Sequence, residues 1–467
     1  MARVVILGAG LTGLSAAYHF EQQGFHDYRL FEKETEVGGL CRSIEHDGFT
    51  FDYTGHLLHI NNEYVRDLIQ KIIGFEEFTA IERRAFIESH GKQVAYPYQM
   101  NLYGLPVDVI AECIEGYLLR KKRHGTKQQD TKPSTSHQQS FHNWVLENFG
   151  AGLAKHFFFP YQEKIFDLSV KNFTASWTNK FVPATSLTSM LTGALQPQGN
   201  TKIGYNAHFW YPKHAGINKL VSNLHQTLTL PVHTNYCVTS VDLVRKVVTF
   251  ANGHTEPFER LISTIPLDIL LSKVHEKSDS TLAPTARKLK CTSVINFTYG
   301  INRPELPAER PEAHWIYYPE KKFPFYRVGF PHNFAKSLVP DGCSSLSGEA
   351  SMLKRDKVHQ ENLIRACQSS AKQAFRFEAH DIITEQTIVL DHAYVIFDRW
   401  RDRHINQLLQ QLETNHVYSI GRFGGWKYSS MQDAFLDGKT VVEKLLNSEL
   451  SLQAFNHKTT LQKRSSL

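Results

Sequence analysis

The stretch VVILGAGLTGLSAAYHF, at residues 4–20, constrains the fold more than any other part of this chain. An apolar run stops at Gly8, turns through Gly10 and Gly13, and continues with the small and apolar pattern of a helix. In such a turn the first glycine allows the tight bend, the second lets a pyrophosphate approach the backbone, and the third lets the helix pack closely on the strand. The stretch therefore predicts a strand, a glycine turn and a helix whose N-terminal N–H groups face phosphates.

An acidic residue and a second glycine turn extend this prediction. YRLFEK predicts the next strand of a βαβ unit, and Glu32 stands at its end, where an acid can bind ribose hydroxyls. The following text, EVGGLCRS, places Gly38, Gly39 and Arg42 just beyond the acid. A glycine triplet alone can be a tight turn without a ligand, whereas triplet, βαβ context and acid together indicate dinucleotide binding. The second glycine turn with its cation favours FAD, because NAD folds usually continue here with another βα unit.

The length and the cysteine content of the chain limit the class of protein. The 467 residues suit two or three domains or one large interleaved α/β body. No apolar run approaches the roughly 18 residues that a membrane helix needs. The start MARVVILGAG enters a strand at once, so we expect no cleavable signal peptide. The six cysteines include no C-x-x-C pair, which indicates reduced thiols in a cytoplasmic protein.

Charge and histidine spacing exclude two classes of ligand. The net charge of +6 suits an anionic substrate or cofactor, but it is spread too thinly to indicate nucleic acid. His56 and His59 have one possible metal-ligand spacing. Because no third ligand stands at a fixed spacing, we expect no metal site.

The order of predicted elements favours an α/β chain whose dinucleotide-binding domain is built from separate parts of the sequence. NNEYVRDLIQKIIG and residues 103–120 predict helices, and residues 230–265 alternate as sheet around the turn ANG. Residues 291–350 form a second β-rich stretch, and SSMQDAFLDGKTVVEKLLNSEL predicts a late helix. The expected units are a first FAD-binding part at 1–95, a helical substrate or lid region at 96–200 with a polar loop at 121–140, a second FAD-binding part at 201–290, a β-rich substrate domain at 291–395, a closing FAD-binding segment at 396–450 and a loose tail at 451–467.

The glycine motifs, together with the late string GRFGGWKYSSMQDAFLDG, resemble the FAD-binding fold of the glutathione-reductase type, in its amine-oxidase-like branch. The resemblance implies a Rossmann-like FAD-binding domain interleaved with a helical region and a β-sheet substrate domain. In this group a late turn and a helix N-terminus meet the flavin, which implies contacts from Gly421, Arg422 and Met431. Val238, in YCVTSV, stands where the group usually contacts adenine through its backbone.

Several longer strings resemble UDP-galactopyranose mutases, particularly the eukaryotic-type branch and its bacterial relatives. FDYTGHLLHINNEY is similar to that family's GGH segment, with Thr54 in place of the first glycine, and PYQEKIF is similar to its PYN-x-K-x-W. HWIYYPEKKFPFYRVGFPHNF and GRFGGWKY are similar to strings that are more specific to the family. FWYPKHAGINKL resembles the wider amine-oxidase-like group, where Gly-Gly commonly replaces Ala215-Gly216. The resemblance covers most of the chain, from residue 4 to about 445.

The resemblance implies unusual chemistry. In these mutases the flavin is first reduced, its N5 attacks the anomeric carbon and expels UDP, and the sugar opens and recloses as a furanose with no net redox. The implied partners are a nucleotide-sugar substrate and an electron donor for FAD. Arg327 and Arg422 match the arginines that handle the diphosphate, and guanidinium forks suit phosphate oxygens. His56 matches the histidine that faces the flavin near N5. The further substrate contacts implied are Trp315, Tyr317, Tyr326 and Tyr428.

Other interpretations stay open. A strand arginine such as Arg327 commonly forms an edge ion pair, and the tyrosines, Trp315 and His56 are commonly structural. The mutases also carry an arginine four residues after a tryptophan in the segment that follows PYN-x-K, whereas ASWTNKFVP has Phe181 there, beside Lys180. A sister activity on another nucleotide sugar, an FAD-dependent oxidase or desaturase of the protoporphyrinogen-oxidase-like group, and a flavin-responsive binding role are the alternatives. The sequence does not set the sugar, the nucleotide, the electron donor or the oligomeric state.

Overall fold

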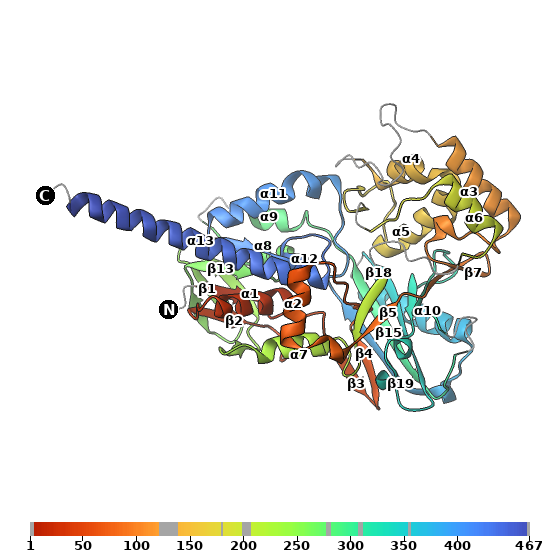
Figure 1. The fold of residues 1–467 in the computed structure, drawn as a ribbon, viewed down its shortest axis with the longest axis horizontal. Helices are drawn as coiled ribbons and strands as arrows, with labels where there is room; N and C mark the ends of the chain where they lie inside the picture. Colours follow the sequence, from red (N-terminus) through yellow and green to blue (C-terminus); the bar gives the residue numbers. More distant parts are fainter. Residues whose placement is uncertain are drawn as a thin grey trace.

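The computed structural model describes residues 4–120, 139–178, 181–198, 207–276, 282–306, 312–353 and 356–464. They form a mixed α/β fold in which a parallel sheet with its helices lies beside a larger, mainly antiparallel sheet and a group of helices (Figure 1). This confirms the predicted α/β class. Of the polar loop predicted at 121–140, residues 121–138 lie outside the described residues.

The parallel sheet contains the predicted βαβ unit. Its order is β20-β13-β1-β2-β9, and each neighbouring pair is parallel. All four residues of β1 are buried, as expected of a parallel strand covered on both faces. The strands are β1 (Val4–Leu7), β2 (Tyr28–Phe31), β9 (Val232–His233), β13 (Arg260–Ser263) and β20 (Val417–Ser419).

The helix that follows the glycine turn packs on the last helix of the chain. Ser15 of α1 (Leu11–Gln22) donates a hydrogen bond to the carbonyl oxygen of Phe435 at 2.8 Å, in α13 (Met431–Arg464). The helices approach so closely that a Cβ on Gly438 would lie 2.6 Å from Ser15 Oγ. Helix α7 (Asn218–Gln226) also contacts α1. The N- and C-terminal parts of the sequence therefore share one apolar core.

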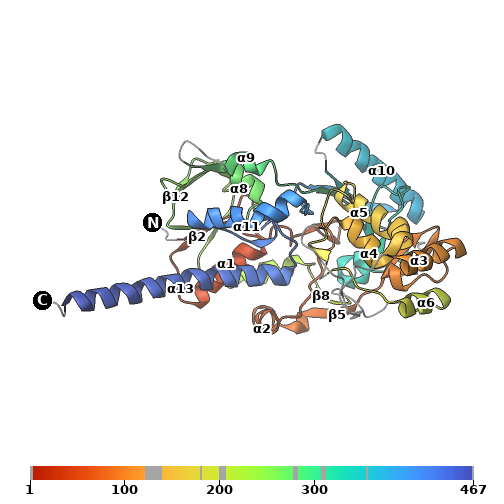
Figure 2. The same ribbon diagram turned by 90° about the horizontal axis from the view of Figure 1, so that it is seen from above.

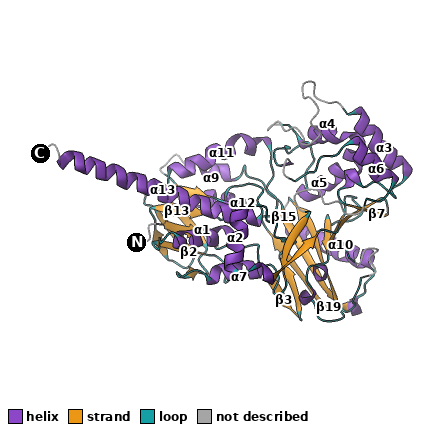
Figure 3. Cartoon of the chain, in the orientation of Figure 1, coloured by secondary structure: helices purple, strands orange, loops and turns teal. Residues whose placement is uncertain are grey.

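The second sheet has seven strands in the order β19-β15-β18-β17-β16-β6-β7. Its pairs are antiparallel except β16 with β6. Helix α10 (Lys357–Phe375) packs against it through Cys367, Ala371 and Phe375 (Figure 3). The strands are β6 (Ala85–Ser89), β7 (Lys92–Ala95), β15 (Ser293–Ile301), β16 (Trp315–Tyr317), β17 (Arg327–Gly329), β18 (Ser344–Met352) and β19 (Ile382–Leu390).

A helical region adjoins this sheet and carries an aromatic core. Helices α3 (Val107–Leu119) and α4 (Phe141–Leu153) cross closely, since a Cβ on Gly152 would lie 2.1 Å from the carbonyl oxygen of Glu112. A π-helical segment (Ala154–Phe158) leads into α5 (Phe159–Phe166), and α6 (Leu187–Leu195) packs on α3. Ring contacts such as that of Phe141 with Trp177 thus stabilise the region.

Smaller elements complete the described structure. A third sheet has the order β12-β11-β10-β14, and its β11–β12 hairpin turns at ANG as predicted. The predicted helix after Asn61 is α2, which Asn62 caps by accepting from Val65 N–H. The remaining elements are β3 (Ser43–His46), β4 (Phe49–Asp52), β5 (Phe78–Glu82), β8 (His208–Pro212), β10 (Val238–Asp242), β11 (Val247–Phe250), β12 (Thr255–Pro257), β14 (Val274–His275), α2 (Glu63–Ile72), α8 (Leu267–Lys273), α9 (Leu282–Ala286), α11 (Arg399–Thr414) and α12 (Gly421–Gly424).

The end of the chain corrects one prediction. Helix α13 continues to Arg464, where a loose tail from residue 451 was expected, and it projects away from the rest of the chain in Figures 1 and 2. The sequence between Lys439 and Arg464 contains no glycine or proline, so nothing in it interrupts a helix. Among the described residues, no helix combines the length and apolarity that a membrane crossing requires.

Candidate active site

The first glycine turn has the geometry that its sequence predicts. Gly8 has a φ of +94°, and its N–H donates to the carbonyl oxygen of Phe31 at 2.7 Å. A Cβ on Gly13 would lie 1.9 Å from the carbonyl oxygen of Gly8, so strand and helix require glycine there. A Cβ on Gly10 would have Gly39 Cα, 3.7 Å away, as its only close neighbour. The space over Gly10 is therefore available to a ligand rather than filled by packing.

The second glycine turn lies directly against the first. Gly38 and Gly39 have φ values of +115° and +58°, and Gly38 N–H donates to the carbonyl oxygen of Ala9 at 2.8 Å. A Cβ on Gly39 would lie 3.1 Å from Gly10 Cα. Arg42 Nε donates to the carbonyl oxygen of Gly39 at 3.0 Å. The two turns together leave a backbone cradle of the kind a pyrophosphate occupies.

Glu32 and Val238 lie at one end of this cradle. The Glu32 carboxylate is 6% exposed and accepts Ala9 N–H at 2.7 Å and Glu34 N–H at 3.1 Å. Tyr236 N–H donates to the carbonyl oxygen of Glu32, which brings the strand that begins at Val238 beside the acid. Further lone pairs of the carboxylate can accept ribose hydroxyls. These residues fit the dinucleotide contacts predicted for them.

The closing segment packs on the N-terminus of α1. Gly421 has a φ of +81°, and a Cβ there would lie 2.8 Å from Thr12 Oγ1. Arg422 follows in the single turn of α12, and Met431 begins α13 and is buried. The structure therefore brings Gly421 to the N-terminus of α1, beside the glycine turns, and Arg422 and Met431 follow it in the same closing segment.

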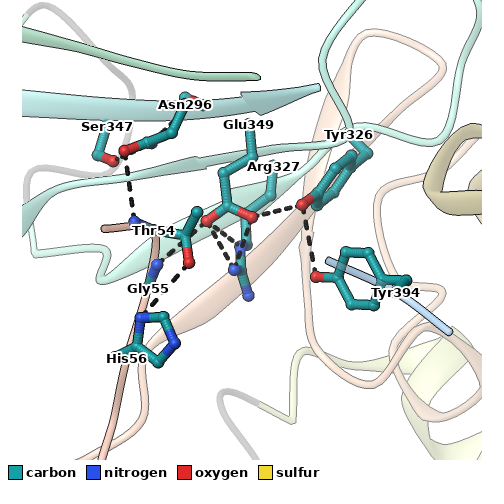
Figure 4. Close-up of polar contacts among 10 residues, drawn as sticks. Thr54, Gly55, His56, Asn296, Tyr326, Arg327, Ser347, Glu349 and Tyr394 are labelled. Atoms are coloured by element: carbon teal, nitrogen blue, oxygen red, sulfur yellow. Dashed lines mark hydrogen bonds and ion pairs between the residues drawn. The ribbon is translucent and has the colours of Figure 1, made fainter. Parts of the chain in front are cut away.

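The two predicted arginines have different electrostatic partners. Arg327 donates to both carboxylate oxygens of Glu349, with Nη2 at 2.6 and 2.8 Å and Nε at 3.2 Å (Figure 4). Arg422 donates to the carbonyl oxygens of Ser429 at 2.9 Å and Ala393 at 3.0 Å. Among the described residues no carboxylate pairs with Arg422. The charge of Arg327 is thus compensated, whereas that of Arg422 is not.

Glu349 organises the site and was not predicted from the sequence. It is 3% exposed and also accepts the Tyr326 hydroxyl at 2.5 Å and Gly55 N–H at 3.2 Å (Figure 4). It stands directly opposite Arg327 in the β17–β18 ladder. The sequence signal that could have identified Glu349 is that it is the one acidic residue in SSLSGEASM, a strand of otherwise small and apolar residues. The Tyr326 hydroxyl, predicted to contact substrate, is engaged by this carboxylate.

His56 lies within the influence of both arginines. Burial and the nearby charge of Arg422 lower its pKa to about 4, with a smaller contribution from Arg327. The imidazole is therefore neutral at pH 7, which suits packing against a flavin ring better than donating a proton. Thr54, which stands where the similar family has glycine, has a φ of +66°. Its Oγ1 lies 3.5 Å from His56 Nδ1.

Tyrosines surround these charges. The rings of Tyr161 and Tyr317 are 5.3 Å apart, and those of Tyr394 and Tyr428 are 6.2 Å apart. The Arg422 guanidinium lies 5.0 Å from the Tyr428 ring centre. Within the described part of the chain the hydroxyls of Tyr161, Tyr317 and Tyr428 have no hydrogen-bond partner. Tyr161 and Tyr394 were not predicted from the sequence, although Tyr161 stands in the string PYQEKIF.

Two further positions border the tyrosines. Trp315 is 4% exposed, its ring lies 6.4 Å from that of Tyr317, and its Nε1–H has no acceptor among the described residues. Phe181 lies 4.7 Å from the Tyr428 ring, so the position at which the similar mutases have arginine does border this site. Lys180 lies outside the described residues. The described residues contain no group of three metal-ligating side chains.

Comparisons with known proteins agree with this geometry. The model of a family described as flavin containing amine oxidoreductase matches residues 11–446. A crystal structure of reduced UDP-galactopyranose mutase is similar with a TM-score of 0.86 and 25% identity, covering 96% of this chain and 94% of that one. A protein from Exiguobacterium sp. 255-15 assigned as a protoporphyrinogen oxidase has a TM-score of 0.71 at 18% identity, over 95% of this chain and 98% of its own, which shows the fold alone.

One curated relative is similar only locally. The 4,4'-diapophytoene desaturase (4,4'-diaponeurosporene-forming) of Staphylococcus aureus is 48% identical over 50 residues, which is 11% of this chain. The match spans only 10% of the length of that relative.

Proposed function

We propose that this chain, which belongs to the flavin-containing amine oxidoreductase family, is a mutase that acts on a nucleotide sugar without net redox. FAD is its cofactor. The paired glycine turns fit FAD, because any side chain on Gly39 would fill the cradle and crowd Gly10. Reduced FAD would supply a nucleophile, N5, for the anomeric carbon of the substrate, and an electron donor is needed to reduce it.

A single observation carries the proposal: the site is rich in donors and positive charge. Among the described residues the Arg422 guanidinium has no carboxylate partner, the hydroxyls of Tyr161, Tyr317 and Tyr428 have no hydrogen-bond partner, and the buried Trp315 Nε1–H has no acceptor. A half-buried cation without a counter-charge and a buried N–H without an acceptor are costly unless a ligand supplies acceptors. A phosphate-linked sugar offers such acceptors. A hydrocarbon offers none, and an amine would add a second positive charge.

The residues of the chain would act together when the bond between sugar and phosphate breaks. Arg422 would bind the departing phosphate, and guanidinium–phosphate hydrogen bonds strengthen as that charge develops. Glu349 would hold Arg327 in one orientation, so that the remaining guanidinium N–H groups face the substrate. Neutral His56 would keep positive charge away from the reduced flavin while its ring packs near it.

The proposal is tested with the FAD-loaded protein reduced by dithionite under argon. Incubation with UDP-, GDP- and CMP-linked hexoses, followed by chromatography, is expected to yield an isomeric nucleotide sugar from at least one of them. The oxidised protein is the matched control and is expected to be inactive. Arg422→Gln should lower turnover by about 100-fold or more, the usual effect of removing a charged transition-state donor. If the reduced protein isomerises none of them, the proposal fails.

An FAD-dependent oxidase or desaturase is the second candidate. It is supported by the local identity to a desaturase and by the aromatic lining of the site. This candidate predicts oxygen consumption, or bleaching of the flavin, with a carotenoid or porphyrinogen substrate. The mutase predicts neither, so the same protein sample separates the two.

A further inference from the structure

The candidate active site holds less positive charge than its two arginines suggest. Glu349 neutralises Arg327 through three hydrogen bonds. Within the described part of the chain, the Arg422 guanidinium has hydrogen bonds to carbonyl oxygens and contacts with ring faces, and no ion pair. The charged side chains that contribute most to the pKa shift of His56, at the centre of the site, are these three. Two positive groups and one negative group leave a single positive charge, on Arg422.

Aromatic side chains surround the position at which the similar mutases carry a further arginine. Trp177 stacks on Tyr428 at 5.8 Å with an interplanar angle of 19°, and Tyr394 stacks on Tyr428 at 6.2 Å with an angle of 29°. The ring of Phe181 packs against Tyr428 at 4.7 Å. None of these side chains carries a positive charge, and the donors they offer are the Tyr394 and Tyr428 hydroxyls and the Trp177 Nε1–H. This wall therefore cannot balance the charge of a second phosphate as an arginine would.

We propose that this site selects nucleotide sugars linked through one phosphate over those linked through a diphosphate, and that Phe181 sets this preference. The inference rests on the proposed function and names its substrate class. A sugar joined to a nucleoside monophosphate carries one negative charge, which Arg422 balances. A diphosphate linkage brings a second charge into a partly buried aromatic site, and the aromatic wall beside Arg422 supplies no cation to balance it. On cleavage, the electron pair of the bond between carbon and oxygen leaves with the nucleoside monophosphate and returns with it.

Binding of the leaving groups tests this selection without turnover. The affinities of UMP and UDP, and of CMP and CDP, are measured calorimetrically on the reduced, FAD-loaded protein. Each pair has the same base, so the two affinities differ only through the phosphates. The wild type is expected to bind the diphosphate no more than about threefold tighter than the monophosphate. Phe181→Arg should raise the preference for the diphosphate by about tenfold or more, because it adds a guanidinium. The matched control Phe181→Leu, which adds no charge, should leave the ratio unchanged.

Three results overturn the inference. One is a wild type that binds UDP and CDP tenfold or more above UMP and CMP. Another is an unchanged ratio in Phe181→Arg when its flavin spectrum and melting temperature match the wild type. The third is a tenfold loss of UDP affinity in Lys180→Met, which would assign the second cation to Lys180. These binding measurements do not depend on isomerisation. A failed mutase assay therefore leaves the measured phosphate preference valid, and a preference for diphosphate does not contradict the mutase proposal.

Discussion

Replacing Glu349 by glutamine tests whether this carboxylate holds the site together. The side chain is 3% exposed and accepts from the Arg327 guanidinium, the Tyr326 hydroxyl and Gly55 N–H. Glu349→Gln keeps the shape but leaves a buried guanidinium without its counter-charge. Breaking a buried ion pair from one side costs about 3–5 kcal/mol. Because the Arg327 side chain is 22% exposed, we expect a loss of unfolding free energy near the lower end, about 3 kcal/mol.

A double-mutant cycle separates this pair from general disruption. Urea unfolding of the FAD-loaded protein, followed by flavin fluorescence and circular dichroism, gives the free energies for Glu349→Gln, Arg327→Met and the double variant. The double variant should be at least about 1 kcal/mol more stable than the two losses added together, because it leaves no uncompensated charge. Glu385→Gln, an exposed change in β19 of the same sheet, is the control and should cost less than about 1 kcal/mol. Strict additivity would refute the reasoning.

Three further predictions concern the glycine turns, His56 and Thr54. Gly10→Ala should leave the melting temperature of the FAD-free protein unchanged but lower visible flavin absorbance per protein, whereas Gly13→Ala, with a Cβ 1.9 Å from a carbonyl oxygen, should lower both. Because the pKa of His56 falls from 6.5 to about 4 on folding, the unfolding free energy should drop as the pH falls through that window. In urea titrations, His56→Asn should make this drop smaller by about 1–3 kcal/mol. Thr54→Gly, at a φ of +66°, should raise unfolding free energy by up to about 1 kcal/mol; a loss would contradict the strain.

Local patterns predicted the parts of the site that one segment forms by itself. The glycine turn at Gly8, the pair Gly38–Gly39 and the closing Gly421 each require positive φ or close approach within a few residues, which the sequence displays directly. Their mutual packing also follows, because the carboxyl ends of parallel strands meet at one edge of a sheet.

The partner of Arg327 could not be predicted in this way. It faces Glu349 because β17 and β18 pair in one antiparallel register, and a register shift of one residue would turn the acid to the other face. Nothing within either strand's own sequence sets that register. Tyr394 reaches the site from a loop between β19 and α11, so its position likewise depends on long-range packing. The sequence therefore predicted the cations and missed the anion that compensates one of them.

The departures from the similar mutase strings have unequal consequences. Thr54 stands where the similar mutases have glycine, and Ala215 stands where the wider amine-oxidase-like group commonly has glycine; both have a positive φ, at +66° and +65°. Glycine adopts this conformation without the local strain that threonine and alanine incur there. Phe181 instead places an uncharged aromatic ring against Tyr428, at the position where the similar mutases have an arginine. A chain that keeps the fold while losing one cation is expected to keep its chemistry and change its ligand.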